Sequence, residues 1–380
     1  MKELKFKKDC RYFLDYKPCK YHKQHKVICE NCKYYDPLKK KILLINLEAI
    51  GDVLRTTAVL KPLKEKYPGC HITWLTTKKA KDVLSNNPYV DEVLTFGIES
   101  ALKLQIKKFD ILINLEKAPE AAALATLVKA EEKKGFGLGD DGFIFPFNKE
   151  AKYLLDTGLS DLLKKESRKT QQEVIFDIIG LKYNREKLIL NLPEEAVRFA
   201  EDFMKKHSIT ESDLVIGFNT GCSNRLFLDR KWTIKGFVGL SELLYKNLKA
   251  KILLFGGPGE VERNKEIIDK ANVPLINTGH NNTLHQFAAL ISKCNLIVTG
   301  DTLAVHIATA LNIPIVVMFG CVTPHEIEIY DNGRKVVSDM DCICCYKEKC
   351  EKEITCMDRI TSEQVFKEIE KLLNKKCIGG

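Results

Sequence analysis

The stretch KILLINLEAIGDVLRTTAVLKPL, Lys41 to Leu63, joins an apolar run to a segment with the spacing of an amphipathic helix, and an acid stands at the junction. The run KILLINL is apolar on both alternating faces, which is typical of a parallel strand covered by helices on both sides. Gly51 allows a tight turn after the strand, and Asp52 begins the helix. Two interpretations of Asp52 stay open: a cap for free N–H groups, or a general base at the edge of a ligand site.

Short apolar runs alternate with helical segments along most of the chain. They are KILLINL, HITWLTT, DEVLTF, FDILINLE and KKGFGLG, and then, after Pro193, DLVIGFNTG, AKILLFGGPG, VPLINTG, CNLIVTGD, IPIVVMFG and RKVVS. This βαβ order predicts an α/β protein with two Rossmann-like, doubly wound domains that face each other across a cleft. We expect little regular structure in FNKEAKYLLDTGLS, and we expect the domain boundaries to divide the chain into residues 1–40, 41–190, 191–340 and 341–380.

Length and charge limit the classes of protein. The 380 residues can bury two cores, and no apolar run approaches the roughly 20 residues of a membrane-spanning helix. We therefore expect a cytoplasmic protein. Residues 1–41 carry most of the net charge of +9, with 13 Lys and Arg against five Asp and Glu. Such a segment suits an anionic partner, such as a phosphorylated lipid surface or nucleic acid, and is equally typical of a solvated terminus.

In the second half of the chain, polar or glycine-rich loops follow the apolar runs. The loop NTGCSNRLFLDRKW contains Arg225 and Lys231 among small polar residues, GGPGE contains Gly257, and Thr323 follows IPIVVMFG. Hydroxyl, backbone and cationic donors of this kind can surround a diphosphate. A solvated basic loop is the competing interpretation of the first of these segments.

The run NLIVTGDTLAVHIATAL opens a helix at Asp301 and Thr302, and the free N–H groups of a helix start favour a phosphate. Asp301 would repel a phosphate there unless it faced sugar hydroxyls. His306, on a helix rich in Ala, Ile and Leu, is more typical of a packed residue than of a ligand. Together with Asp52, these loops predict a nucleotide-diphosphate site formed by Thr220, Gly221, Arg225, Gly257, Asp301, Thr302 and Thr323, with His306 as a secondary candidate.

The successive motifs AIGDVLRTTAVLKPLKEKYPGCHITWLT, TGCSNRLFLDRKW, GGPGE and GDTLAVHIATALNIPIVVMFG resemble those of the family 9 glycosyltransferases, the heptosyltransferases. The resemblance runs from about Lys41 to Thr361 in the same order. The commoner family form has Gly after the Asp-Thr pair, where this sequence has Leu303. This difference bears on the details of donor binding.

The resemblance implies a GT-B fold and inverting transfer of a heptose from an ADP-linked donor to a hydroxyl of an acceptor. Residues 41–190 would form the acceptor domain and residues 191–340 the nucleotide-sugar domain. Asp52 would match the catalytic base of the family and Lys231 its phosphate-contacting lysine, with Asp301, Thr302 and His306 at its donor-binding helix. No divalent ion would be required, since Lys231 and helix N–H groups can stabilise the leaving diphosphate.

The cysteines fall into two groups, which in a chain without a secretion signal indicates metal before disulfides. The C-terminal group is Cys342, Cys345, Cys350 and Cys356, with Cys344 as a spare ligand, and the N-terminal group is Cys10, Cys19, Cys29 and Cys32. Zinc, iron and an iron–sulfur cluster stay open, because thiolates serve each. In a branch of the resembling family a similar C-terminal group holds iron. For the N-terminal group we expect a structural metal that docks the basic segment beside the acceptor cleft.

The first hypothesis is therefore a cytoplasmic enzyme, peripheral at the inner membrane, that uses an ADP-sugar and an anionic acceptor. That acceptor would be a lipopolysaccharide-core-like glycan, a glycolipid or a protein. The nearest rival is a GT-B transferase with another nucleotide sugar. The second rival is a non-catalytic metalloprotein that binds nucleic acid or another partner, and the presence of both Asp52 and Lys231 speaks against it.

Overall fold

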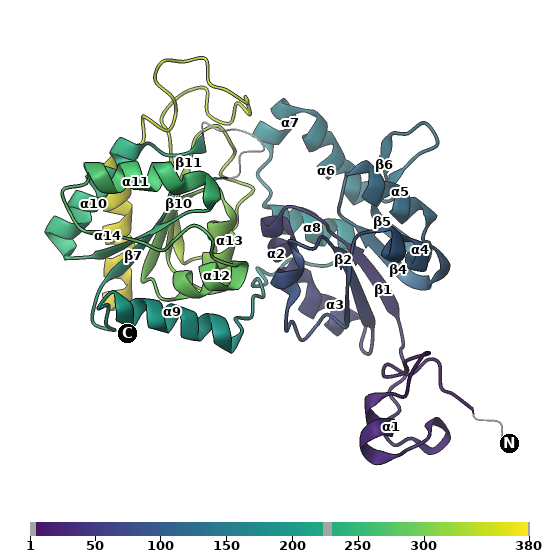
Figure 1. The fold of residues 1–380 in the computed structure, drawn as a ribbon. Helices are drawn as coiled ribbons and strands as arrows, with labels where there is room; N and C mark the ends of the chain where they lie inside the picture. The colour runs from purple at the N-terminus through teal and green to yellow at the C-terminus, as the bar shows by residue number, and fades with distance from the viewer. Residues whose placement is uncertain (1–4, 223–229, 379–380) are drawn as a thin grey trace.

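The computed structural model describes residues 5–222 and 230–378, with side chains described up to residue 374, and contains two six-stranded sheets (Figure 1). Their strand orders are β3-β2-β1-β4-β5-β6 and β12-β11-β10-β7-β8-β9. All these strands pair in parallel except β5 and β6, which are antiparallel. The strands are β1 (Lys41–Ile45), β2 (His71–Thr76), β3 (Glu92–Thr95), β4 (Lys108–Asn114), β5 (Lys129–Leu138), β6 (Ile144–Pro146), β7 (Val215–Asn219), β8 (Lys251–Phe255), β9 (Leu275–Asn277), β10 (Leu296–Gly300), β11 (Ile315–Phe319) and β12 (Gly333–Val337).

Helices connect the strands and cover both faces of each sheet (Figure 1). Strand β1 shows why: Ile42 and Leu44 belong to one buried cluster, while Leu43 and Ile45 belong to another on the opposite face. The two parallel sheets of the predicted GT-B-like α/β fold are thus confirmed. The longer helices are α2 (Ile50–Thr56), α3 (Leu60–Lys66), α4 (Ile98–Ile106), α5 (Pro119–Leu127), α6 (Lys149–Leu159), α7 (Asp161–Glu166), α8 (Gln171–Ile179), α9 (Glu194–Lys206), α10 (Ile234–Leu248), α11 (Val261–Lys270), α12 (Leu284–Ser292), α13 (Leu303–Ala310) and α14 (Ser362–Ile378).

The segment expected to lack regular structure is helical, so that prediction was wrong. It forms α6 and is followed directly by α7, whose first turn is capped by the Ser160 hydroxyl. Helix α6 buries Ala151 and Thr157 and packs against α8. Burial of one face compensates for the weak helix propensity of Gly158.

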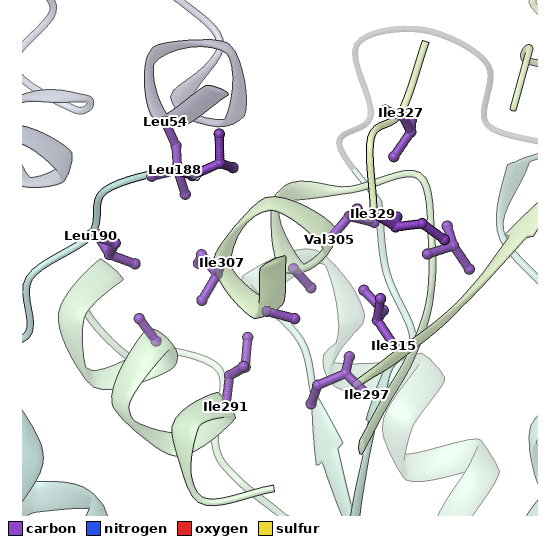
Figure 2. Close-up of a cluster of buried hydrophobic side chains, with 14 of the residues drawn as sticks. Leu54, Leu188, Leu190, Ile291, Ile297, Val305, Ile307, Ile315, Ile327 and Ile329 are labelled. Carbon is purple, nitrogen blue, oxygen red and sulfur yellow. The ribbon is translucent and has the colours of Figure 1, made fainter. Parts of the chain in front are cut away.

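One buried cluster runs through both domains, and Figure 2 shows part of it. Leu54 on α2, Leu188 in the connecting segment, Val305 and Ile307 of α13 and Ile291 of α12 all belong to it, and α2 contacts α13. The domains therefore meet through a packed apolar contact. This contact fixes the starts of α2 and α13 relative to each other.

Residues 5–40 form a small module with one short helix, α1 (Lys20–His25), that extends from the first domain (Figure 1). Arg11 holds the module to that domain, because its guanidinium donates to the carbonyl of Gly69 at 3.0 Å and pairs with Asp91. These partners precede β2 and β3, so the module lies at the amino ends of the strands. The expected docking beside the acceptor cleft was wrong, since a cleft of this fold opens at the carboxyl ends.

The chain closes with a loop and a helix on the second domain. Residues 338–361 contain no helix or strand, and α14 then packs against α10 and β12. The indole of Trp232 donates to the carbonyl of Ile360 at 2.9 Å and anchors the start of α14. None of the helices in the described ranges has both the length and the apolar character needed to cross a membrane.

Candidate active site

Two adjoining cavities lie at the carboxyl ends of the sheets, between the domains. The helix-start cavity, of about 610 Å³, is lined by residues that include Asp52, Asn219, Gly221, Glu260, Thr302 and His306. The acidic cavity, of about 740 Å³, is lined by residues that include Glu48, Glu116, Glu120, Lys164, Glu326 and Tyr346. The charged residues Glu48, Asp52, Arg230 and Asp301 line both. These four residues therefore stand where the two cavities meet.

Asp52 is the third residue of α2, and both interpretations of it from the sequence apply. Its Oδ2 accepts a hydrogen bond from the N–H of Ala49 at 3.1 Å, and its Oδ1 pairs with Arg55. Burial raises the pKa of Asp52, but the Arg55 guanidinium and the Ala49 N–H outweigh it, so the pKa lies below its ordinary value. The side chain is still 41% exposed. Capping thus leaves an ionised carboxylate facing the cavities.

His306 on α13 packs directly against the start of α2. A Cβ on Gly51 would lie 2.7 Å from the Cδ2 of His306, so only glycine fits this approach of the two helices. Burial, together with the nearby Arg55, lowers the pKa of His306 to about 3, although Asp52 opposes this shift. The ring is therefore neutral at physiological pH. It is a packed residue at the domain contact, and its edge also lines the helix-start cavity.

We expect Gly51→Ala to lower the free energy of unfolding by about 1–3 kcal/mol, because the new methyl group overpacks the contact with His306. The added helix propensity of Ala acts in the opposite direction. Gly97→Ala is the matched control: Gly97 precedes α4 with an extended backbone, and no atom lies within 4 Å of its Cβ position. Urea unfolding measures both variants. His306→Ala should restore part of the loss, and a Gly51→Ala protein as stable as the control would contradict the prediction.

The start of α13 is held by a network of short polar side chains. The Thr302 hydroxyl accepts from the N–H of Ala304 at 3.2 Å and from the side-chain amide of Asn219 at 3.1 Å. Thr299 lies 3.0 Å from the same hydroxyl. Helix capping thus accounts for the position of Thr302, and its role as a phosphate donor stays a prediction. Burial raises the pKa of Asp301, and the Arg55 and Arg230 guanidinium groups oppose this rise.

Glu260 joins three loops at the wall of the helix-start cavity. Its Oε2 accepts from the N–H of Gly257 at 3.1 Å, and its Oε1 lies 3.2 Å from the Nζ of Lys231. A Cβ on Gly221 would collide with the Glu260 carboxylate, so glycine is required there as well. Lys231 is 20% exposed and Glu260 9% exposed. The carboxylate therefore holds the ammonium group just behind the residues that line the cavity.

The other predicted donor residues occupy different environments. Thr220 is buried, and its hydroxyl donates to the carbonyl of Phe255 at 3.2 Å. Thr323 is buried too, and its backbone N–H donates to the Tyr346 hydroxyl at 3.2 Å. Leu303 lines the helix-start cavity as the first residue of α13. Arg225 lies outside the described residues.

The acidic cavity contains groups that the sequence alone did not single out. The Oε1 of Glu116, which follows β4, accepts from the N–H groups of Leu47 at 2.6 Å and Glu48 at 3.0 Å. Burial raises the pKa of Glu116 and of Glu326. Sugar hydroxyls are good partners for such carboxylates.

The missed residues come from positions whose role depends on tertiary structure. Arg55 could have been found, because it stands three residues after Asp52 on the same helix face. Glu116 could have been suspected as a polar residue directly after an apolar run. In the sequence, Glu260 looks like an ordinary turn residue, because only the fold brings its carboxylate close to Lys231.

Residues 100–355 match the family described as Glycosyltransferase family 9 (heptosyltransferase). This match covers well over half of the chain. The chain belongs to glycosyltransferase family 9. It is therefore an enzyme, a glycosyltransferase, and the family predicted from its motifs is confirmed.

A named relative and two solved structures support the assignment of this chain to family 9. It is 25% identical over 327 residues to "Lipopolysaccharide core heptosyltransferase OpsX" of Haemophilus influenzae, covering 83% of this chain and 87% of that protein. A family 9 structure from Veillonella parvula has a TM-score of 0.70 at 22% identity, covering 89% and 98% of the two chains. The structure of Escherichia coli ADP-heptose heptosyltransferase II has a TM-score of 0.66 at 22% identity, covering 88% and 99%. These structures establish the common fold.

The structure gives no support to the metal centre expected at the C-terminal cysteines of this family 9 chain. Cys344 and Cys356 are buried in the packed core of the second domain, and a Cβ on Gly320 would collide with the Cys356 sulfur. In residues 5–222 and 230–374, whose side chains are described, no three His, Cys, Asp or Glu side chains are grouped so as to hold a metal ion. Burial raises the pKa of Cys356 to about 11, and the nearby thiols of Cys345, Cys350 and Cys342 contribute to this rise.

A more distant solved structure bears on these cysteines. The dodecameric, iron-containing glycosyltransferase TibC of enterotoxigenic Escherichia coli has a TM-score of 0.52 at 13% identity, covering 89% of this chain and 77% of that one. A likeness at this identity concerns the fold alone. The likeness therefore gives no support to iron at the C-terminal group. Buried side chains such as Met357 and Ile360 pack the loop against the second domain.

Proposed function

We propose that this glycosyltransferase moves a heptose from an ADP-linked donor to an acceptor hydroxyl with inversion at the anomeric carbon. The observation that supports this best is the position of Asp52, which lines both cavities. Glu48 and Asp301 line both cavities as well, but Asp52 is the carboxylate at the start of α2 whose pKa Arg55 lowers, whereas burial raises the pKa of Asp301. A donor in the helix-start cavity and an acceptor in the acidic cavity would then meet beside an ionised Asp52. A single displacement needs its base at that junction.

The proposed reaction has few steps. The acceptor oxygen forms a bond to the anomeric carbon from the face opposite the diphosphate, its proton passes to Asp52, and the bond from the anomeric carbon to the diphosphate oxygen breaks. Because the pKa of Asp52 is lowered, the proton moves late, when the attacking hydroxyl has become acidic. The leaving ADP oxygen gains negative charge, which Lys231 and the N–H groups at the start of α13 stabilise. These groups supply the charge that a divalent ion would otherwise bring.

The choice of donor and compartment rests on the relatives. Names of the similar proteins refer to ADP-heptose and to lipopolysaccharide core. The helix-start cavity contributes N–H groups and Arg230 for a diphosphate, and neither feature selects the base of the nucleotide. We propose an ADP-sugar on this ground, and we place the reaction in the cytoplasm, at the inner face of the membrane.

The acceptor proposal follows from the acidic cavity. Six carboxylates, against Lys164 and Arg230, line it, so the reacting end of the acceptor should be a sugar rich in hydroxyl groups. Phosphate groups of a lipopolysaccharide-core-like glycan or glycolipid would have to lie beyond this wall, and a protein acceptor would present a neutral hydroxyl. Nucleic acid fits poorly, because its phosphates would meet the carboxylates.

Isothermal titration with ADP-heptose, GDP-sugars, UDP-sugars and the free diphosphates tests the donor. We expect ADP-heptose to bind at least about tenfold more tightly than the other nucleotide sugars. Asp52→Asn should bind it unchanged, because the carboxylate acts on the acceptor. Selective binding of a GDP- or UDP-sugar would replace the donor and keep the mechanism. Binding of none would overturn the proposed ADP-sugar donor.

A further inference from the structure

The N-terminal module has no core of its own. None of the side chains in residues 5–40 is buried. Large apolar groups stay exposed, such as Phe6 at 56% and Ile28 at 45%. A segment of this size rarely folds without a disulfide, a metal or a partner, because it cannot bury enough apolar surface. Something other than side-chain packing must therefore stabilise it.

The module nevertheless has a defined backbone. The N–H of Arg11 donates to the carbonyl of Asp36, and the N–H of Leu38 donates to the carbonyl of Asp9, both at 2.8 Å. The rings of Tyr21 and Tyr34 stack with their centroids 4.2 Å apart. These contacts close the ends of the module and leave its middle open.

The middle of the module is a cavity of about 410 Å³, and all four N-terminal cysteines line it. Cys29 begins a single 3-10 turn that ends at Asn31, so Cys29 and Cys32 approach the cavity from one short loop. Cys10 and Cys19 come from two other segments. Aromatic rings make up much of the remaining wall, including those of Tyr12, Phe13, Tyr21 and Tyr34. Four thiols thus surround a volume far larger than the roughly 15 Å³ that one water needs.

The size of this cavity distinguishes the candidate ligands. A single zinc ion needs its ligands grouped about one point at bonds of about 2.3 Å, and no such group of three occurs in the described residues. An iron–sulfur cluster instead distributes its thiolates over several iron atoms. All four cysteines are free thiols, so none is committed to a disulfide.

The charged residues around the cavity have a small positive balance. Lys5, Lys7 and Lys17 line it together with the four cysteines, against the carboxylates of Asp15 and Glu30. A cluster ligated by four thiolates carries net negative charge, so nearby ammonium groups stabilise it. Three lysines of the basic N-terminal segment would then be partners of an anion inside the module.

We propose that Cys10, Cys19, Cys29 and Cys32 bind an iron–sulfur cluster that takes the place of a hydrophobic core in the N-terminal module. The cluster is structural: the module lies at the amino ends of the strands, held through Arg11, away from the cavities between the domains. This inference does not depend on the donor or acceptor of the transfer reaction.

The test uses the full chain with Cys342→Ser and Cys345→Ser, so that the C-terminal thiols contribute no iron, purified without oxygen. We expect iron and acid-labile sulfide in equal amounts, with visible absorption that dithionite bleaches. Adding Cys29→Ser and Cys32→Ser should lower iron and sulfide at least about tenfold and speed protease cleavage before Lys41.

Cys70→Ala is the matched control, because Cys70 is buried beside the module and does not line the cavity. It should keep iron, sulfide and protease resistance. Zinc without sulfide in the starting protein would overturn the proposal, and so would the lack of both metals after anaerobic reconstitution. Iron and sulfide that persist after replacement of Cys29 and Cys32 would overturn it as well.

Discussion

Replacing Asp52 with Asn is expected to lower kcat by about 10²–10⁴, the usual contribution of a general base, while donor affinity stays unchanged. The Asn amide oxygen can still accept from the N–H of Ala49, so the start of α2 is kept. Arg55 loses one partner, but Asp301 and Glu326 also lie close enough to raise its pKa. The free energy of unfolding should therefore fall by no more than about 1 kcal/mol.

The pH dependence of the wild-type enzyme follows from the same carboxylate. Its pKa lies below the ordinary value in the folded protein, so Asp52 is ionised above that pH and loses its charge only as the pH falls through the lowered value. We therefore expect that protonation of Asp52 does not lower kcat/KM at any pH above about 4. Titration of His306 does not change kcat/KM near neutral pH, because its pKa of about 3 keeps the ring uncharged there.

Transfer assays on Asp52→Asn, Asp52→Glu and Asp202→Asn distinguish the loss of a catalytic group from an unspecific effect of substitution on the folded protein. Asp202 is exposed on α9 and serves as the control, with full activity expected. Asp52→Glu should recover part of the rate, since it retains a carboxylate at the junction of the cavities. An Asp52→Asn protein that folds normally and transfers sugar at the wild-type rate would remove Asp52 from the mechanism.

The fold was predictable because its signals are local. Ile42 and Leu44 face one side of β1, and Leu43 and Ile45 the other, which is the pattern of a strand covered on both faces. The first part of β5, KAEEKK, gives no such signal, yet it pairs with β4 over its length. Helix α6 was missed for a similar reason, because packing against α8 decides it and propensity does not.

The site was predictable only where it follows strands. Asp52 and Asp301 were found in this way, and the structure brings both to the wall shared by the two cavities. The hydrogen bond from Leu47 to Glu116 joins residues 69 positions apart, and the Lys231 pair with Glu260 spans 29. No spacing in the sequence encodes such contacts. For the cysteines, number and order could be read from the sequence, but the difference between a packed loop and a cavity could not.

Replacing Lys231 with Met is expected to lower kcat by about 10²–10³, the usual cost of one charge-stabilising donor. Negative charge on the diphosphate grows as its bond to the sugar breaks, so the ammonium interacts more strongly with the transition state than with the bound donor. Met keeps the apolar stem and removes the charge. Lys235→Met, at an exposed position on α10, is the control and should retain full activity.

The Glu260 pair makes this prediction more specific. In the structure the Lys231 ammonium lies 3.2 Å from the Glu260 carboxylate, and the bound diphosphate must compete with that carboxylate for it. Lys231→Met alone leaves Glu260 without this cation beside the donor, so KM for the donor should rise as well. Adding Glu260→Gln removes the repulsion and should restore KM but not kcat, because the developing charge still lacks its cation. If Lys231→Met kept kcat within about twofold of wild type, Arg230 and the start of α13 would suffice for the leaving group.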